Sequence, residues 1–435
     1  MSALPRKVIL SGSDCFHLVL DKHAHKYGTG SNVMRIVFQS HEKVSAQQLS
    51  AKLNASPLVQ WLCNIRLHSG GLFGRPHWEY TGGNQLIPFY EHHYADKGEI
   101  PVTLLQRDLP LRQQHFIECD LVHYPDDTTA IVISWNHILL DGRGIGMLIQ
   151  HLNELHEGQP ARPADVLFPP SEKKANWPAY IRNMYRVKSF IEKSSRAPIA
   201  SVASGYGKEP SLFHTQLVQF SVEETARIQQ QATAAGARFG PNLFYLSCCA
   251  QAVRARLDEK NIPGPFWIPI PYDGRLRGAF GPVITNTVAF LFYRLERDQL
   301  NQLSTTVAAL QQQMTDQMRD KMPQRYSMLL SMMRHIPLNL YYFLVNRRGK
   351  GAFASFLYSS TGDSFNKIDR FMGFPVEHVT IYPSPTFPPG LTFSFLKHRE
   401  ALNINIAYSP DIVPQADLQL LIARLRQMLL GSGSE

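Results

Sequence analysis

The sequence predicts an α+β protein made of two halves of similar size that are joined by a long connection. Its apolar residues alternate between the 3.6-residue spacing of helices and the short β-branched runs of buried strands. Between residues 160 and 211 the composition shifts to Pro, Ser, Lys and Arg, which is typical of a connecting segment. With 435 residues, 44% of them hydrophobic, the chain can bury a core in each half.

The first half begins with a strand, a helix and a second strand. The helix is expected to begin at Ser45, because Gln48 follows three residues later as in a capping box. Residues 128–135 form a nearly continuous apolar run rich in β-branched side chains, which indicates a strand buried on both faces. The predicted elements are strands over 32–38, 60–67 and 128–135 and a helix over 45–54.

A helix is expected directly after Gly142, since apolar residues recur there at helical spacing until Gly158 and Pro160 end it. The connection that follows carries one further helix, expected over 177–193. Its Arg and Lys side chains form either a basic docking surface or an ordinary solvated face. The predicted division is an N-terminal subdomain over 1–165, a linker over 166–211, a C-terminal subdomain over 212–430 and a flexible tail over 431–435.

The second half repeats the mixture of strands and helices. Its helices are expected over 222–235, 242–257 and 414–430. Its strands are expected over 217–221, 266–270, 287–294, 391–396 and 403–408.

The composition limits the partners that the protein can have. A net charge of +9 and a pI near 9.2 favour anionic partners such as a phosphorylated cofactor, an acidic carrier protein or anionic lipid. Nucleic acid is not expected, because the Lys and Arg residues are not interleaved with aromatic residues. The five cysteines have no C-x-x-C spacing, so neither a zinc site nor a disulfide framework is expected. Reduced cysteines and the lack of a secretory signal predict a cytoplasmic protein.

One apolar stretch, Met328–Val345, is a candidate for contact with a membrane. Arg334 and Pro337 interrupt it, whereas a membrane span needs roughly 20 mainly apolar residues. A basic run over 346–350 follows it. The stretch is therefore expected to be a helix pair broken at Pro337, which lies on a membrane surface, lines an acyl-chain cavity or packs as an ordinary buried pair.

His137 is the strongest candidate for a catalytic residue. The preceding strand would fix its ring, and the turn that follows would expose it to a cleft, where a neutral imidazole can take a proton from a hydroxyl or an amine. Asp141 would lie near a helix N-terminus, which favours a carboxylate, and Gly142 would let the backbone turn without a Cβ clash. The alternative is a hydrogen-bonded core histidine beside a helix cap.

Three further patterns do not indicate a site. The run over 91–98 holds two adjacent histidines but has the wrong spacing, and it is expected to be a surface loop. His23 and His25 could share one side of a strand and bind a metal, but no third ligand is near in the sequence, so surface histidines are expected. The glycines over 142–146 lack the G-x-G-x-x-G spacing of a dinucleotide site.

The segment from Asn136 to Gly142 resembles the HHxxxDG motif of the chloramphenicol acetyltransferase-like superfamily. That superfamily includes plant BAHD acyltransferases, condensation domains of nonribosomal peptide synthesis and bacterial wax ester synthase/diacylglycerol acyltransferases. Further segments resemble other parts of these proteins in the same order and cover nearly the whole chain. They are the strand–helix–strand opening, the helix start over 240–243, the strand and R-x-R turn over 268–277, the segment 279–286, the segment 369–376 and the closing hairpin and helix over 390–414.

The resemblance implies a fold and a reaction. It implies two chloramphenicol acetyltransferase-like subdomains, each a mixed β-sheet flanked by helices, with a tunnel between them. His137 would be the general base, and Asp141 would be structural and paired with Arg275. The acyl donor would be a thioester of CoA or a carrier protein and the acceptor a hydroxyl or, less often, an amine, with no metal and no tightly bound cofactor. The wax ester synthase features favour a lipid-like acyl chain.

The chain departs from the motifs of the superfamily at several positions. Asn136 replaces the first histidine of HHxxxDG, and Asn286, a few residues after Gly281, is the candidate for an oxyanion donor. Asn136 favours a rival interpretation, a non-catalytic condensation-like module that binds a carrier protein or an acyl chain. The sequence is also compatible with an amide-forming condensation enzyme and with a peripheral lipid-binding protein.

Overall fold

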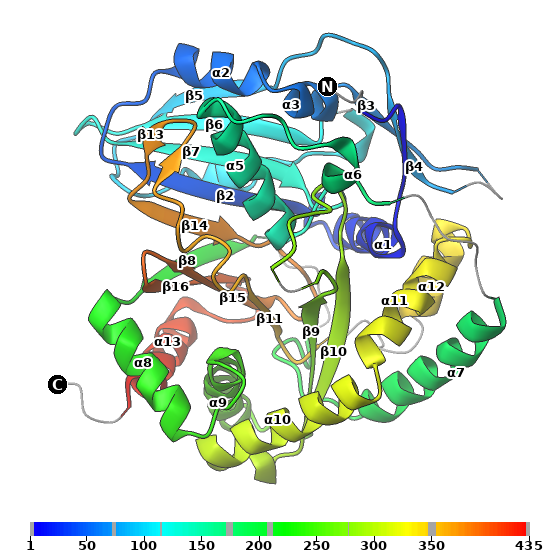
Figure 1. Ribbon diagram of the computed structural model, residues 1–435. Helices are drawn as coiled ribbons and strands as arrows, with labels where there is room; N and C mark the ends of the chain where they lie inside the picture. The colour runs from blue at the N-terminus through cyan, green and yellow to red at the C-terminus, as the bar shows by residue number, and fades with distance from the viewer. Residues whose placement is uncertain are drawn as a thin grey trace.

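The computed structural model describes residues 4–71, 75–113, 115–170, 177–206, 212–276, 278–346 and 354–431. Its two halves lie one above the other in Figure 1, and each packs helices against mixed or antiparallel β-sheet. Each half has its own large cluster of buried apolar side chains. The predicted α+β architecture of two subdomains is therefore confirmed.

A five-stranded sheet forms the centre of the N-terminal half, with β5 parallel to β6 and the other neighbours antiparallel. Its central strand β7 is buried along its whole length, as its apolar β-branched sequence predicts. In order across the sheet the strands are β14 (His378–Tyr382), β2 (Val33–Ser40), β7 (Thr129–Asn136), β6 (Ile117–His123) and β5 (Phe89–His93). The helices of this half are α2 (Ala46–Asn54), α3 (Pro57–Cys63), α4 (Val102–Leu105), α5 (Gly142–His156) and α6 (Ala164–Leu167).

A second, antiparallel sheet of three strands lies at the edge of this half. Its order is β1 (Lys7–Ile9), β4 (His77–Tyr80) and β3 (Ile65–His68). Trp78 of β4 is buried and packs edge-to-face on Phe116, so this small sheet is joined to the main apolar core.

The C-terminal half contains a four-stranded sheet and a long hairpin. The order of the sheet is β11 (Leu357–Ser360), β15 (Leu391–His398), β16 (Ala401–Tyr408) and β8 (His214–Gln219), and the hairpin is β9 (Phe266–Asp273) with β10 (Val288–Leu295). Two-residue strands β12 (Arg370–Phe371) and β13 (Phe374–Pro375) precede β14. The helices are α8 (Val222–Ala234), α9 (Asn242–Glu259), α10 (Leu303–Arg319) and α13 (Gln415–Leu430).

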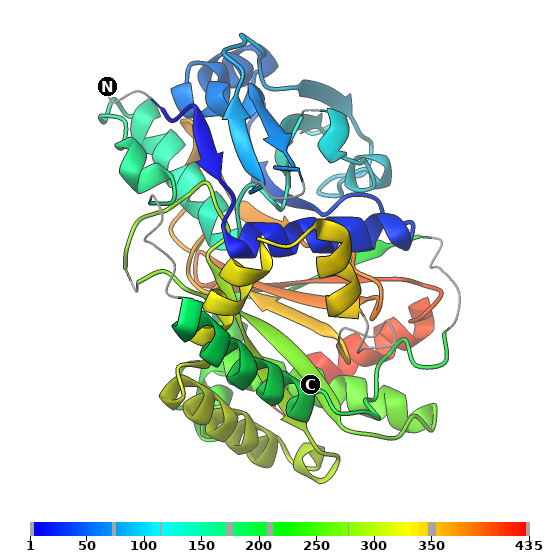
Figure 2. The same cartoon turned by 90° about the vertical axis from the view of Figure 1, so that its right-hand side faces the viewer.

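Helix α1 (Gly12–Lys26) lies between the two halves. In Figure 2 it crosses the molecule as the dark blue helix, with the yellow helices α11 (Met322–Met333) and α12 (Leu338–Asn346) against it. Helix α7 (Trp177–Ser194) packs on α11. Gly12 allows the close approach of α1 to α11, because a Cβ on it would lie 2.3 Å from the carbonyl carbon of Leu330.

The structure corrects several expectations. The strand predicted over 60–67 is mostly helix α3, because Ser56 caps the helix and Pro57 starts it, and only its last residues form β3. The expected surface loop at 91–98 begins within strand β5. Strand β14, which lies within the range predicted for the C-terminal subdomain, pairs with β2 in the N-terminal sheet. The basic run over 347–350 and the tail after 431 lie outside the described residues.

Candidate active site around His137

His137 is the first residue of the tight turn that connects β7 to α5. Its backbone N–H donates to the carbonyl of Asn32 at 2.7 Å, which continues the pairing of β7 with β2 beyond the strand. The indole of Trp135 donates to the carbonyl of Leu140 at 3.0 Å and closes the turn from its other side. The turn is therefore held at both ends, and His137 is the one residue in it that is not fully buried.

Asn136 stabilises the turn from within. Its Oδ1 accepts from the backbone N–H of Ile138 at 3.2 Å, and its Nδ2 donates to the carbonyl of Leu109 at 3.2 Å and to Asp21 at 3.4 Å. An amide that replaces the first histidine of the motif fills a structural position, as short polar side chains often do in turns.

Asp141 and Arg275 form a buried ion pair that joins the two halves. The Nη1 of Arg275 lies 2.8 Å from Oδ2 of Asp141, and the two side chains are 1% and 5% exposed. Asp141 also caps α5 through the N–H of Gly144 at 2.7 Å and accepts from the N–H of Thr287 at 2.8 Å. All of these contacts hold the turn in place, so Asp141 faces the scaffold and has the geometry of an orienting residue.

Arg275 also holds the segment that follows it. Its Nε donates to the carbonyl of Pro282 at 2.9 Å and its Nη2 to the carbonyl of Thr285 at 3.3 Å. One guanidinium therefore fixes both the motif of the N-terminal half and the loop of the C-terminal half that faces it. The second arginine of the R-x-R turn, at position 277, lies outside the described residues.

The position at which the structure requires a glycine is Gly144. The expectation that Gly142 has this steric role is wrong. Gly142 is the first residue of α5, and its backbone is not left-handed. A Cβ at this position would make only an ordinary contact of 3.5 Å with Thr361. A Cβ on Gly144 would lie 2.9 Å from the carbonyl oxygen of Val283. The constraint arises because the loop of the C-terminal half packs directly on the first turn of α5.

Asn286 holds the backbone beneath His137. Its Nδ2 donates to the carbonyls of His137 and Ile138 at 2.9 and 3.2 Å, and to Asp14 at 3.0 Å. These contacts use the whole amide nitrogen, so the structure leaves no N–H of this side chain for an oxyanion. The expectation that Asn286 is an oxyanion donor therefore does not fit the observed geometry.

The ring of His137 has one buried and one available nitrogen. Its Nδ1 is buried and has no hydrogen-bond partner among the residues that the structure describes. Oδ1 of Asn286 is also buried and also lacks a partner among these residues. Burial lowers the pKa of His137, while its own backbone, Asp141 and the Asn286 side chain act in the opposite direction. Because Nδ1 is buried, Nε2 is the ring nitrogen left for a substrate.

Helix α1 contributes three buried polar side chains that no sequence motif indicated. Asp14, His17 and Asp21 recur along one face at helical spacing, and we name them the α1 row. Asp14 accepts from the backbone N–H of Asn286 at 2.6 Å, and Asp21 accepts from that of Asn32 at 2.9 Å. The capping box of Ser11 and Asp14 predicts where the helix starts, but the polar spacing of the row does not indicate that this face is buried.

The histidines His23 and His25 lie on α1, not on a strand, and His23 is buried. Its Nε2 lies 2.7 Å from the carbonyl of Phe387, and burial lowers its pKa to about 4. The expectation of two surface histidines is therefore wrong for His23.

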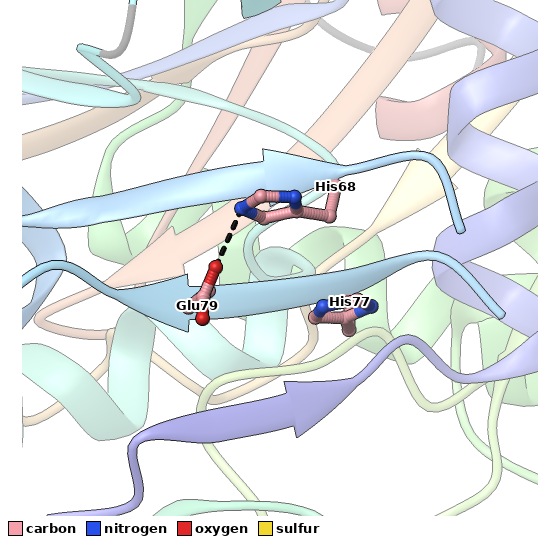
Figure 3. Close-up of side chains that lie close together, drawn as sticks. All are labelled: His68, His77 and Glu79. Carbon is pink, nitrogen blue, oxygen red and sulfur yellow. Dashed lines mark ion pairs between the residues drawn. The ribbon is translucent and has the colours of Figure 1, made fainter. Parts of the chain in front are cut away.

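One group within the described part of the chain brings three metal-ligating side chains together. His68 of β3 is paired with His77 of β4, and Glu79 lies two residues further on the same face (Figure 3). The Nε2 of His68 already forms an ion pair with Glu79 at 2.7 Å, and the register places Lys7 and Arg66 on either side of Glu79. These cations and the ion pair account for the cluster without a metal ion.

The sequence matches no protein-family model and no curated protein. The fold, however, matches solved structures over nearly the whole chain. A trichothecene 15-O-acetyltransferase from Fusarium sporotrichioides aligns with a TM-score of 0.72 at 13% identity, over 98% of this chain and 95% of the other. The first condensation domain of the calcium-dependent antibiotic synthetase aligns with a TM-score of 0.69 at 16% identity, again over 98% and 95%.

Polyketide synthase associated protein 5 from Mycobacterium tuberculosis also aligns, with a TM-score of 0.62 at 14% identity over 99% of this chain and 100% of the other. The matched structures thus include an acetyltransferase and condensation domains. This protein has the two-subdomain, chloramphenicol acetyltransferase-like fold of condensation domains.

Proposed function

We propose that the protein is an acyltransferase that moves an acyl group from a thioester of CoA or of a carrier protein to a hydroxyl acceptor, with His137 as general base. The observation that carries the proposal is the state of the His137 ring. Its Nδ1 is buried without a hydrogen bond to the residues that the structure describes, burial lowers the pKa of the ring, and Nε2 is the nitrogen left to accept a proton.

The proposed reaction needs no covalent intermediate on the protein. The acceptor hydroxyl gives its proton to Nε2 of His137 as its oxygen attacks the thioester carbonyl carbon. The tetrahedral intermediate then collapses, the carbon–sulfur bond breaks, and the thiolate takes the proton from the imidazolium. Asp141 and Arg275 act only by holding the turn, so both substrates must reach Nε2 between the two halves.

A thioester turnover assay tests this proposal. We expect the purified protein to release free thiol from acyl-CoA or acyl-carrier donors when a hydroxyl acceptor is present, and to form the matching ester, as detected by mass spectrometry. Long acyl chains should react faster than acetyl if the group is lipid-like. Thiol release without ester would indicate hydrolysis. Binding of acyl thioesters without turnover over a broad acceptor panel would contradict the proposal and favour the non-catalytic binding module.

The pH dependence of turnover should follow the low pKa of His137. Burial lowers this pKa from its ordinary value near 6.5, so the ring is neutral at neutral pH. The ring loses its base form only when the pH falls below this lowered pKa. We expect kcat/KM to be flat from about pH 7 upward and to decrease on the acid side of about pH 6.5. A midpoint above 6.5 would contradict the proposed environment of the ring.

A membrane surface is a further proposed partner. No helix among the described residues is long and apolar enough to cross a bilayer. Helix α12 nevertheless exposes four apolar side chains while it buries Tyr341, and Lys22 and Lys26 of α1 lie over the ring of its Tyr342. The exposed apolar side chains are Leu338, Leu340, Phe343 and Leu344. An apolar helix face with lysines beside it suits an anionic bilayer.

Co-sedimentation with vesicles tests this surface. We expect the protein to bind vesicles that contain phosphatidylserine more tightly than vesicles of phosphatidylcholine alone. The variant L340S/F343S should weaken that binding by about tenfold or more, since each apolar side chain contributes roughly 1.5–3 kcal/mol when it is buried. Leu420→Ser on α13, which is equally exposed, is the control. Equal binding by both variants would contradict the assignment of α12.

A further inference from the structure

The α1 row places a second histidine against the proposed base. The rings of His17 and His137 are stacked, with their centroids 4.0 Å apart and their planes 26° from parallel. His17 is 6% exposed, so its position is fixed by the surrounding protein. Figure 2 shows α1, as the dark blue helix, running between the two halves.

The orientation of the His17 ring is also fixed. Its Nδ1 lies 3.2 Å from the amide nitrogen of Asn32, whose backbone carbonyl accepts from the N–H of His137. An amide nitrogen donates, so Nδ1 of His17 is the acceptor and its proton is on Nε2. Asn32 thus connects the two histidines by two routes, through its side chain to His17 and through its backbone to His137.

The neighbours of His17 in the row hold the same motif. Asp14 binds Asn286, which supports the carbonyl of His137, and Asp21 binds both Asn32 and Asn136. The three side chains therefore contact the proposed base, the residue before it and the amide beneath it. A helix that served only as packing would place apolar side chains on this buried face.

We propose that His17 is a positioning residue: the face of its ring holds the His137 imidazole in the orientation that directs Nε2 to the substrates. The proposal rests on the proposed function, since a fixed orientation matters only if Nε2 accepts a proton. Two imidazoles at this separation do not both carry a charge, and burial and His137 together lower the pKa of His17 well below its ordinary value. His17 therefore acts as a neutral flat surface.

Three variants test the proposal. His17→Phe keeps a flat ring, His17→Leu removes it, and His23→Leu makes the same change at another buried histidine of α1. We expect His17→Leu to lower kcat by about tenfold to a hundredfold with KM within about twofold, because a misplaced base loses rate rather than affinity. His17→Phe should stay within about threefold of the wild type, and His23→Leu should leave kcat unchanged.

Two outcomes would overturn the proposal. If His17→Phe lost as much activity as His17→Leu, a ring nitrogen and not the stacked face would be the essential feature. If His17→Leu and His23→Leu had equal kcat values, His17 would contribute only to the stability of α1.

A readout that does not need turnover separates this proposal from the proposed function. Ring ¹⁵N chemical shifts of His137, assigned by their loss in His137→Gln, report its tautomer. We expect the shifts of one tautomer in the wild type and in His17→Phe, and averaged shifts in His17→Leu. If the wild type shows no turnover, the proposed function fails while these shifts still decide whether His17 positions the ring. Unchanged shifts in His17→Leu would contradict the proposal.

Discussion

Replacing His137 by alanine is expected to lower kcat for thioester turnover by about a hundredfold to ten-thousandfold, the usual contribution of a positioned general base. The effect should fall on kcat, because Nε2 takes a proton in the transition state and contributes little to ground-state binding. The fold should persist, since the turn is held by the backbone of His137 and by Trp135, Asp141 and Arg275, none of which needs the imidazole.

The measurement is free thiol release under saturating donor, with the thermal unfolding midpoint recorded beside it. His41→Ala, at an exposed histidine of the same half, is the control and should retain full activity. If His137→Ala released thiol at the wild-type rate with formation of ester, another group would be the base. A variant that lost activity together with its folded structure would require His137→Gln, which retains a polar side chain of similar length.

The sequence predicted the strand–turn–helix of the motif well because its signals are local. The apolar β-branched run gives β7, and the spacing of apolar residues after Gly142 gives α5, with bounds within one or two residues of those observed. The pairing of Asp141 with Arg275 was inferred from family resemblance, and these residues are 134 positions apart in the chain. No periodicity in the sequence could place that arginine against that carboxylate.

The α1 row could not be recognised in the same way. Its residues are acidic and imidazole side chains on a buried helix face, whereas sequence patterns identify a buried face by its apolar residues. The row is buried because α1 lies between the two halves, and the polar atoms are satisfied by residues from elsewhere in the chain, including Asn286. The role of Asn286 was misjudged for the same reason, since only the structure shows that Asp14 and two carbonyls use its amide.

Replacing Arg275 by methionine is expected to lower the free energy of unfolding by about 3–5 kcal/mol. The substitution leaves the Asp141 carboxylate buried without its cation, and the cost of an uncompensated buried charge exceeds what the intact pair contributes. Urea denaturation followed by circular dichroism measures the change. Arg319→Met breaks an exposed pair with Asp316 and should cost at most about 1 kcal/mol. Equal losses in the two variants would contradict the buried character of the Asp141–Arg275 pair.

The double variant D141N/R275M separates the ion pair from the other contacts of Arg275. An amide at position 141 can still accept from the N–H of Gly144, so the double variant should lose less stability than the two single changes added together. Activity should not recover in parallel, because the bonds from Arg275 to the carbonyls of Pro282 and Thr285 remain absent. Pro282 and Thr285 come shortly before Asn286 in the chain, and the side chain of Asn286 donates to the carbonyl of His137. Loss of the bonds from Arg275 should therefore disturb the support of His137. We therefore expect a folded protein with a low kcat, and recovery of both properties would show that Arg275 acts through Asp141 alone.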